Sequence, residues 1–186
     1  LNNTHNTVFR GLPTNWTSIR LKLAFAPTQN YQQAGLVAYQ DDDNYVQITR
    51  IYENGNKLTF AREANGNPTN LNSLDVTATS NLYLRLDRDP ATNIITAYYS
   101  LNGTTWTPLW SVTQTLSNPR LAIVVGASPG GFPNADLSWV EVYADVSTSG
   151  TLLSLSPSNL VFSTVVGSVN PSSQIVNVLN DGPAVL

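Results

Sequence analysis

The chain has 186 residues, of which 41% are hydrophobic and 11% charged, and its formal net charge is −3 at pH 7. This content supports a packed core, while the absence of any Lys/Arg run argues against a nucleic-acid interface or binding to an acidic membrane surface. There is no Cys, so neither a disulfide framework nor a thiolate metal site can form. No apolar run approaches the roughly 20 residues that span a bilayer, so we expect no membrane insertion.

Alternation of apolar and polar side chains with a period of two dominates the first 145 residues and predicts half-buried strands. The pattern is clearest at residues 18–25 and 82–87. The remaining predicted strands are 34–40, 45–52, 58–62, 94–100, 121–127 and 137–144. No segment has the periodicity of an amphipathic helix, so the sequence predicts an all-β chain.

Clusters of Asn, Asp, Gly and Pro separate these runs, at 41–44, 53–56, 65–68, 89–93 and 102–103. Because Asn-Gly pairs accept positive φ and suit short hairpins, residues 52–58 and 98–106 are predicted to be hairpin connections. Many short strands joined by such turns indicate a two-sheet sandwich or jelly roll.

A change in composition divides the chain. Small polar residues at 147–150 predict a linker between a domain at 1–146 and a short β segment at 151–186. The segment has strand-like runs at 153–157, 160–163 and 173–178. Roughly 35 residues bury too little surface for an independent two-sheet core, so we expect this segment to need further strands or a partner. Self-association through residues 151–186 is one way to supply them.

Three stretches, taken together, resemble a known family. They are QAGLVAYQDDDNYV at 33–46, LYLRL at 82–86 with YYSLNGTTW at 98–106, and ADLSWVEV at 135–142. In this order and spacing they resemble the concanavalin A-like domain at the C-terminus of family 43 β-xylosidases and of related secreted bacterial proteins. The resemblance covers residues 5–145 and implies a concanavalin A-like jelly roll.

The two ends of the chain add to this resemblance. Because the chain opens close to what resembles an early strand of the family, its first strands are expected to be absent or supplied differently. The tail resembles the opening strands of bacterial immunoglobulin-like repeats. Both ends suggest a segment of a multidomain extracellular protein.

The sequence does not predict an enzyme. Its glutamates are Glu53, Glu63 and Glu141, whereas a sandwich glycanase needs two facing carboxylates roughly 5–9.5 Å apart. The E-x-D-x-x-E arrangement of sandwich glucanases is absent around Glu141. The one histidine, His5, gives no support to a Ser-His-Asp triad or a zinc site.

A run of acidic residues at 41–43, followed by Asn44, is the strongest local charge cluster. Carboxylate oxygens can bind calcium, and Asp41 and Asp43 are the candidate ligands because they share one side of an extended segment. A solvated hairpin turn is the interpretation we favour, because the EF-hand spacing is absent. No other cofactor is expected.

Aromatic side chains bind sugars by stacking on the sugar ring, while nearby polar groups hydrogen-bond to its hydroxyls. Most aromatic residues here are expected in the core. The candidate ligand-binding residues are Tyr39, Asn44, Tyr45, Arg50 and Tyr52 on one predicted hairpin, and Phe132 in an irregular loop. By parity, Tyr39 and Tyr52 are expected to meet different neighbours.

Two functions are compatible with these observations. The first is a non-catalytic carbohydrate-binding or accessory module of a secreted or cell-surface bacterial protein, with a glycan as partner. The alternative is a structural or adhesive subunit of a surface protein or extracellular fibre, assembled through β-strand pairing.

Overall fold

The computed structural model describes residues 7–76, 81–126, 133–145, 153–157 and 173–180. Within these ranges it contains strands and turns, and no helix that could cross a membrane. The chain divides into two units, Leu1–Asp145 and Val146–Leu186, and each is described by itself.

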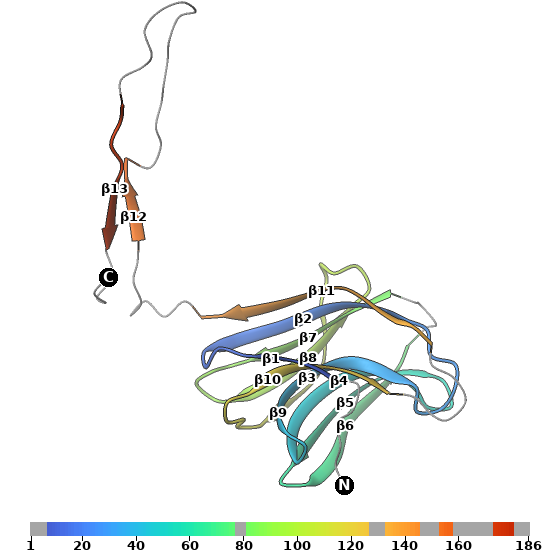
Figure 1. The fold of residues 1–186 in the computed structure, drawn as a ribbon. Helices are drawn as coiled ribbons and strands as arrows, with labels where there is room; N and C mark the ends of the chain where they lie inside the picture. The colour runs from blue at the N-terminus through green and yellow to red at the C-terminus, as the bar shows by residue number, and fades with distance from the viewer. Residues whose placement is uncertain (1–6, 77–80, 127–132, 146–152, 158–172, 181–186) are drawn as a thin grey trace, which may run out of the picture. The chain divides into compact units, whose positions relative to one another are not determined.

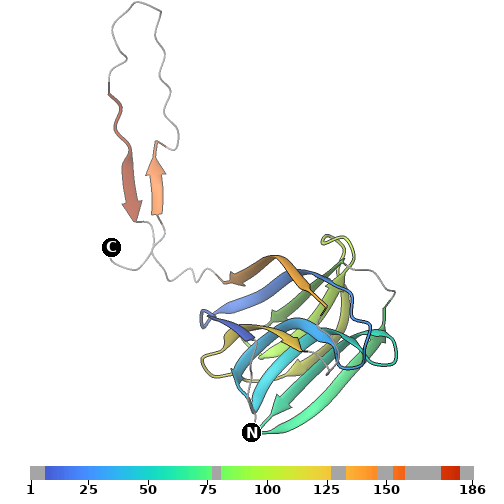
Figure 2. The ribbon, with the colours of Figure 1, turned by 45° about the vertical axis from the view of Figure 1, so that its right-hand side comes forward.

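Two antiparallel sheets are layered on one another in the first unit (Figure 1). The six-stranded sheet has the order β1 (Thr7–Gly11), β10 (Arg120–Gly126), β3 (Gln33–Asp41), β4 (Asn44–Tyr52), β5 (Asn56–Ala64) and β6 (Asn67–Asp75). The five-stranded sheet has the order β11 (Ala135–Ala144), β2 (Trp16–Phe25), β7 (Asn81–Arg88), β8 (Ile94–Ser100) and β9 (Thr107–Thr113). The view in Figure 2 shows the same two layers with curved strands. The predicted all-β sandwich is confirmed.

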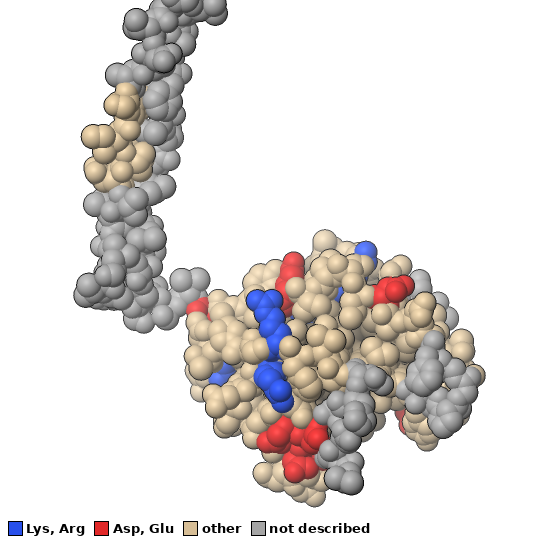
Figure 3. All heavy atoms as spheres, viewed as in Figure 1, with Lys and Arg blue, Asp and Glu red and all other residues tan. Residues whose placement is uncertain are grey.

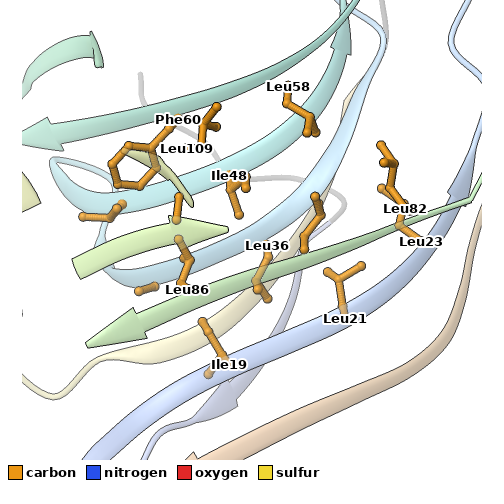
Figure 4. Packing of buried hydrophobic residues seen from close by; sticks show 14 of the residues in the cluster. Ile19, Leu21, Leu23, Leu36, Ile48, Leu58, Phe60, Leu82, Leu86 and Leu109 are labelled. Carbon is orange, nitrogen blue, oxygen red and sulfur yellow. The ribbon is translucent and has the colours of Figure 1, made fainter. Parts of the chain in front are cut away.

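The core lies between the sheets because every second residue of the central strands is apolar. Ile19, Leu21 and Leu23 of β2 have no exposed surface. Residues of the six-stranded sheet face them, among them Leu36 and Ile48 (Figure 4). Burying one such side chain stabilises the fold by about 1.5–3 kcal/mol, so this layer is the main source of stability.

The predicted turn chemistry is also observed. Asn65 and Gly66 have φ values of 52° and 72° and join β5 to β6, as a two-residue hairpin with positive φ at both positions requires. Asn54, with φ 52°, lies in the connection from β4 to β5. The predicted hairpin connections at 52–58 and 98–106 therefore join antiparallel neighbours.

Three strands were not predicted: β1, β6 and β9. All three lie at sheet edges. β6 has the sequence NPTNLNSLD, and most of its residues are exposed, so it lacks the alternation that marks a half-buried strand. The predicted turn at 65–68 is wrong in its second half, because Asn67 and Pro68 already pair with β5. β9 contains Pro108, which suits an edge strand, and the register shifts beside it.

In the second unit, β12 (Leu153–Ser156) pairs antiparallel with β13 (Asn177–Asn180). The strand predicted at 173–178 is only partly correct, because residues 173–176 are not in a strand. The predicted run at 160–163 and the linker at 147–150 lie outside the described residues.

Candidate functional site

The structure separates the predicted ligand-binding residues into two groups. Tyr39 and Tyr45 are opposite each other across β3 and β4, on the outer face of the six-stranded sheet. Arg50 and Tyr52 have the parity of the buried Ile48, so they face the inner side at the far end of β4. Phe132 lies outside the described residues, as does His5. The prediction that Tyr39 and Tyr52 have different neighbours is confirmed.

Tyr39 is packed by neighbours on the outer face. Its ring lies 4.9 Å from the ring of Phe9, and the Arg120 guanidinium lies 4.2 Å from the Phe9 ring and 5.0 Å from the Tyr39 ring. The Tyr39 hydroxyl donates a hydrogen bond of 2.6 Å to Asp42 Oδ1. Because only 7% of Tyr39 is exposed, its ring offers little surface to a ligand.

Tyr45 is half-buried beside Glu63. Burial and a hydrogen bond to the Glu63 carboxylate raise the pKa of Tyr45 to about 12. The hydroxyl of Tyr45 therefore remains protonated at neutral pH and acts as a donor to Glu63.

The acidic cluster forms the turn between β3 and β4. Asp41 Oδ1 accepts hydrogen bonds from the Asp43 backbone NH (3.0 Å) and from Asn44 Nδ2 (2.9 Å). Asp41 Oδ2 accepts one from Gln40 Nε2 at 2.8 Å. The bonds from the Asn44 and Gln40 side chains lower the pKa of Asp41. Asn44 Oδ1 in turn accepts a hydrogen bond from the Asn65 backbone NH (3.0 Å), which links this turn to the turn between β5 and β6.

These contacts match the interpretation as a turn. In the ranges that the structure describes, no three His, Cys, Asp or Glu side chains lie close enough together to hold a metal ion. Calcium binding by Asp41 and Asp43 remains a prediction.

Charged side chains are sparse on the rest of the surface too. On the face drawn in Figure 3 they form a short basic row and a few acidic patches.

Arg50 and Tyr52 line a pocket at one end of the sandwich. Its walls are Ala26, Pro27 and Thr28, which follow β2, and Arg50, Tyr52 and Asn56 from the β4–β5 hairpin. The pocket has a volume of about 230 Å³. We call it the end pocket.

Arg50 is the charged wall of the end pocket. Only 1% of the residue is exposed, and Arg50 Nη2 donates a hydrogen bond of 3.0 Å to Asn56 Oδ1. Burial lowers the pKa of Arg50, but a guanidinium keeps its charge at neutral pH. The pocket thus combines an amide, a hydroxyl and a phenol with the apolar surface of Ala26 and Pro27, and the buried Arg50 guanidinium lies behind Asn56.

The loop at 26–32, which forms one wall of the pocket, has a defined conformation. Gln32 is 2% exposed, and its side-chain Oε1 accepts the backbone NH groups of Thr28 (2.8 Å) and Gln29 (3.1 Å). The loop is joined to the β4–β5 turn by paired amides, since Asn30 Oδ1 accepts the Asn54 NH at 2.7 Å and Asn30 Nδ2 donates to Asn54 Oδ1 at 3.2 Å.

Tyr31 stands out in this loop. It is the third residue of a turn closed by a hydrogen bond from Gln32 N to Gln29 O (3.1 Å), and its φ is 69°. Positive φ at this position is normally left to Gly or Asn, and it costs a bulky residue about 1–2 kcal/mol. The Tyr31 NH donates to the carbonyl oxygen of Tyr52 at 2.9 Å, so Tyr31 lies next to a pocket residue. Its side chain is 64% exposed.

The sequence interpretation included Arg50 and Tyr52 but missed Tyr31, Thr28 and Asn56. A single aromatic residue among polar ones, PTQNYQQ at 27–33, was the available signal. The role of Tyr31 depends on its positive φ and on the contact between the loop at 26–32 and the β4–β5 hairpin. Neither feature can be predicted from the alternation of apolar and polar residues.

Comparisons with known proteins identify the family of the chain. Residues 1–136 match the family model described as beta xylosidase C-terminal concanavalin A-like domain. No curated protein sequence matches the chain.

Solved structures agree with this fold. The GH43 protein BlXynB from Bacillus licheniformis has a TM-score of 0.70 and 24% identity, and the match covers 76% of this chain and 30% of that one. A xylan β-1,4-xylosidase from Bacillus halodurans C-125 has a TM-score of 0.66 and 15% identity, over 77% of this chain and 31% of that one. The carbohydrate-binding module CBM66 from Bacillus subtilis has a TM-score of 0.52 and 8% identity, over 76% and 84% of the two chains.

At these identities the solved structures show the fold, and the chain spans only about a third of the two longer proteins. The family follows from the sequence match, which covers most of the chain. The chain therefore belongs to the family of concanavalin A-like domains found at the C-terminus of β-xylosidases.

Proposed function

We propose that this chain is a non-catalytic carbohydrate-binding accessory module of a secreted or cell-surface protein, and that it binds a glycan in the end pocket beside Tyr31. The observation that carries the proposal is the pocket of about 230 Å³ itself, with its convergent polar groups. The exposed Tyr31 adds to it, because the backbone NH of Tyr31 bonds to the pocket residue Tyr52. Membership in a family of β-xylosidase C-terminal domains and the shared fold of a carbohydrate-binding module support it.

The walls of the pocket suit a sugar. A sugar ring has C–H faces that bury well against apolar groups and hydroxyls that need hydrogen-bonding partners. Pro27 and Ala26 supply the apolar part, while Asn56 and Thr28 supply an amide and a hydroxyl. A pocket of this size holds one or two sugar residues rather than a long chain, so we expect it to bind a glycan end.

Tyr31 is the proposed stacking platform. An exposed aromatic ring held in a strained backbone conformation contributes little to folding, and such strain is concentrated at ligand sites. The hydrogen bonds of Gln32 and of the Asn30–Asn54 pair fix the loop before the ligand arrives. A pre-formed loop lowers the entropic cost of binding.

The positions of the glutamates support a non-catalytic role. Glu53 lies in the β4–β5 turn and Glu63 at the opposite end of β5, while Glu141 lies on β11 in the other sheet. The three glutamates therefore lie in different parts of the sandwich, which fits a non-catalytic role because glycoside hydrolysis uses two carboxylates at one sugar site.

Titration calorimetry with neutral oligosaccharides, including xylo-oligosaccharides of increasing length, tests the proposal. We expect binding that saturates at short length and falls about tenfold or more in Tyr31→Ala and in Asn56→Ala, because stacking and one or two hydrogen bonds are lost. Trp110→Ala is the matched control, since Trp110 is an exposed aromatic (54%) on β9. Equal loss in the control, or no binding by any neutral oligosaccharide, would contradict the proposal.

Assembly through strand pairing is a second candidate function, for residues 146–186. One observation favours it: β12 and β13 form a two-stranded sheet with each other. An isolated two-stranded ribbon is at best marginally stable in water, and its open edges can accept further strands. A comparison of the assembly states of the full chain and of residues 1–145 tests this candidate.

A further inference from the structure

The outer face of the five-stranded sheet carries an unusual set of side chains. Cations alternate there with aromatic rings, on strands whose other side faces the core. We call this surface the aromatic–cationic face, and it consists of Arg20, Lys22, Tyr83, Arg85, Tyr98, Trp106, Trp139 and Tyr143.

Two arginines occupy the middle of this face. The Arg85 guanidinium lies 4.1 Å from the Tyr98 ring and 4.6 Å from the Trp106 ring. The Arg20 guanidinium lies 4.3 Å from the Tyr143 ring and 5.8 Å from the Trp106 ring. Trp106, from the connection between β8 and β9, therefore contacts both arginines.

A second group lies beside them. Lys22 Nζ lies 5.7 Å from the Tyr83 ring, and the Tyr83 and Trp139 rings are 6.0 Å apart. The connection that carries Trp106 passes close to this group, because a Cβ added to Gly103 would lie 2.8 Å from the Tyr83 ring. Gly103 also has φ 77°, so both the close Tyr83 ring and the backbone conformation favour glycine at this position.

The carboxylates near the face are already engaged. Asp87 forms an ion pair with Arg85 (3.1 Å) and accepts a hydrogen bond from the Ser18 hydroxyl (2.6 Å). Glu141 Oε2 accepts the Tyr143 hydroxyl at 2.8 Å. Among the described residues, no ion pair joins Arg20 or Lys22 to a carboxylate.

Asp87 pairs with Arg85, and Glu141 lies opposite Arg20 on β11, so these two carboxylates offset part of the positive charge of the face. Lys22 lies opposite Trp139 rather than a carboxylate. Arg20 and Lys22 therefore keep a local positive charge that attracts an anion. They are two residues apart on β2 and therefore project about 7 Å apart on the same side. The rings around them offer flat apolar surface. A ligand that matches both features has extended, stackable rings and negative groups.

We propose that the aromatic–cationic face binds an anionic glycan, with sugar rings against Tyr143 and its neighbours and uronate carboxylates paired with Arg20 and Lys22. Single-stranded nucleic acid also combines flat rings with negative charge. The observations favour the glycan, because high-affinity nucleic-acid interfaces neutralise about six to ten phosphates and this face has three cations. The face lies on the opposite side of β2 from the core, so it is distinct from the end pocket and is tested separately.

The test compares three probes: xylan bearing glucuronic acid, the same xylan after reduction of its carboxyl groups, and a single-stranded oligonucleotide. Affinity electrophoresis or calorimetry at low and high salt measures binding. We expect the acidic xylan to bind at least tenfold more tightly than the reduced one, and the difference to shrink at high salt because exposed charges are screened.

Variants separate charge from stacking. Arg20→Gln with Lys22→Gln should weaken binding of the acidic xylan about tenfold, the combined effect of two exposed charge pairs, and leave the reduced xylan unaffected. The control, Arg10→Gln with Lys57→Gln, removes the same amount of charge from the six-stranded sheet. It should change the binding of neither the acidic nor the reduced xylan. Tyr143→Ala, at an edge and 43% exposed, should weaken binding of both xylans.

Several outcomes would overturn the proposal. These are equal binding of the two xylans by the unmodified chain, equal loss in the control double variant, or no binding at all. Tighter binding of the oligonucleotide than of the acidic xylan would assign the face to nucleic acid instead. Because Asn56 lines the end pocket and Tyr31 bonds to a residue of it, a loss of neutral-sugar binding in their variants alone leaves this proposal intact.

Discussion

Arg20 and Arg85 lie directly opposite each other on the neighbouring strands β2 and β7. Like charges in this position are destabilising, so the sheet needs a compensating interaction. The Trp106 ring supplies part of it, since both guanidinium groups lie within 6 Å of its centre, at 5.8 and 4.6 Å. A residue from a connecting loop thereby stabilises a pair of charges in the middle of a sheet.

This relationship predicts an energetic coupling between Trp106 and Arg85. A double-mutant cycle with Trp106→Ala and Arg85→Met, measured by urea unfolding, should give a favourable coupling free energy of about 0.5–2 kcal/mol, because Arg85 is 14% exposed and lies against the ring. Trp110→Ala combined with Arg85→Met should be additive to within about 0.5 kcal/mol. A coupling near zero for the first pair would mean that the ring contact does not stabilise the fold.

Tyr31 provides a prediction in which stability and binding change in opposite directions. Tyr31→Asn should raise the free energy of unfolding by up to about 1 kcal/mol, because Asn tolerates positive φ and the ring is 64% exposed. The same change should weaken neutral-sugar binding. Tyr31→Phe keeps both ring and strain, and should leave stability and binding close to those of the unmodified chain. If Tyr31→Asn instead destabilises the fold, the ring has a structural role in the loop.

Acid should destabilise the fold through two turn carboxylates. Bonds from Asn44 and Gln40 lower the pKa of Asp41, and bonds from the Thr92 side chain and the Ala91 NH lower the pKa of Asp89. A lowered pKa in the folded state contributes stability that is present above the unfolded value, near 3.9, and is lost as pH falls through the folded value.

Urea unfolding between pH 5 and pH 2 measures this effect. Asp41→Asn combined with Asp89→Asn should reduce the dependence of the unfolding free energy on pH in that window, and should lower stability at pH 5. Asp136→Asn is a control for the loss of one carboxylate. An unchanged slope in the double variant would mean that other groups cause the acid sensitivity.

Chelation of calcium should leave the melting temperature unchanged if Asp41 and Asp43 only form a turn.

Tyr45 makes a corresponding prediction at alkaline pH. Its pKa is raised to about 12 by burial and by Glu63. Since the unfolded value is near 10, the unfolded state loses its proton first, and stability should fall as pH rises from about 10 toward 12. Tyr45→Phe should flatten this part of the profile. Absorbance titration should show one tyrosine in the unmodified chain that ionises last.

The sequence predicts most of the sandwich because burial imposes a period of two on its central strands. Leu82, Leu84 and Leu86 had to be apolar, and each is fully buried. The same rule fails at β6, where solvent faces most side chains and Asn-rich sequence is tolerated. Edge strands carry a weaker pattern because fewer of their residues meet the core.

The candidate sites are less predictable for a different reason. Parity correctly separated Tyr39 from Tyr52, because it follows from strand geometry alone. The end pocket requires the loop at 26–32 to meet the β4–β5 hairpin, and the aromatic–cationic face requires Trp106 to fold back from a connection. Both are contacts between segments far apart in the sequence, on which local patterns carry no information.

Truncation after Asp145 tests the independence of the sandwich. The Asp145 NH donates to the Asn15 carbonyl oxygen at 3.0 Å, so this residue completes the hydrogen bonds of the β11 end. A chain of residues 1–145 keeps every strand of both sheets, and we expect its melting temperature to stay within about 2 °C of that of the full chain, since no described core residue is removed.

The same two chains test assembly. If the module functions by binding glycans, both the full chain and residues 1–145 should be monomers in sedimentation and in electron micrographs. Oligomers or polymers formed by residues 1–186 but not by 1–145 would establish the β12–β13 segment as an assembly element, because its open strand edges would then be the surfaces that pair. That outcome would favour the structural function over the binding module, whereas monomers in both cases would direct the work to the end pocket.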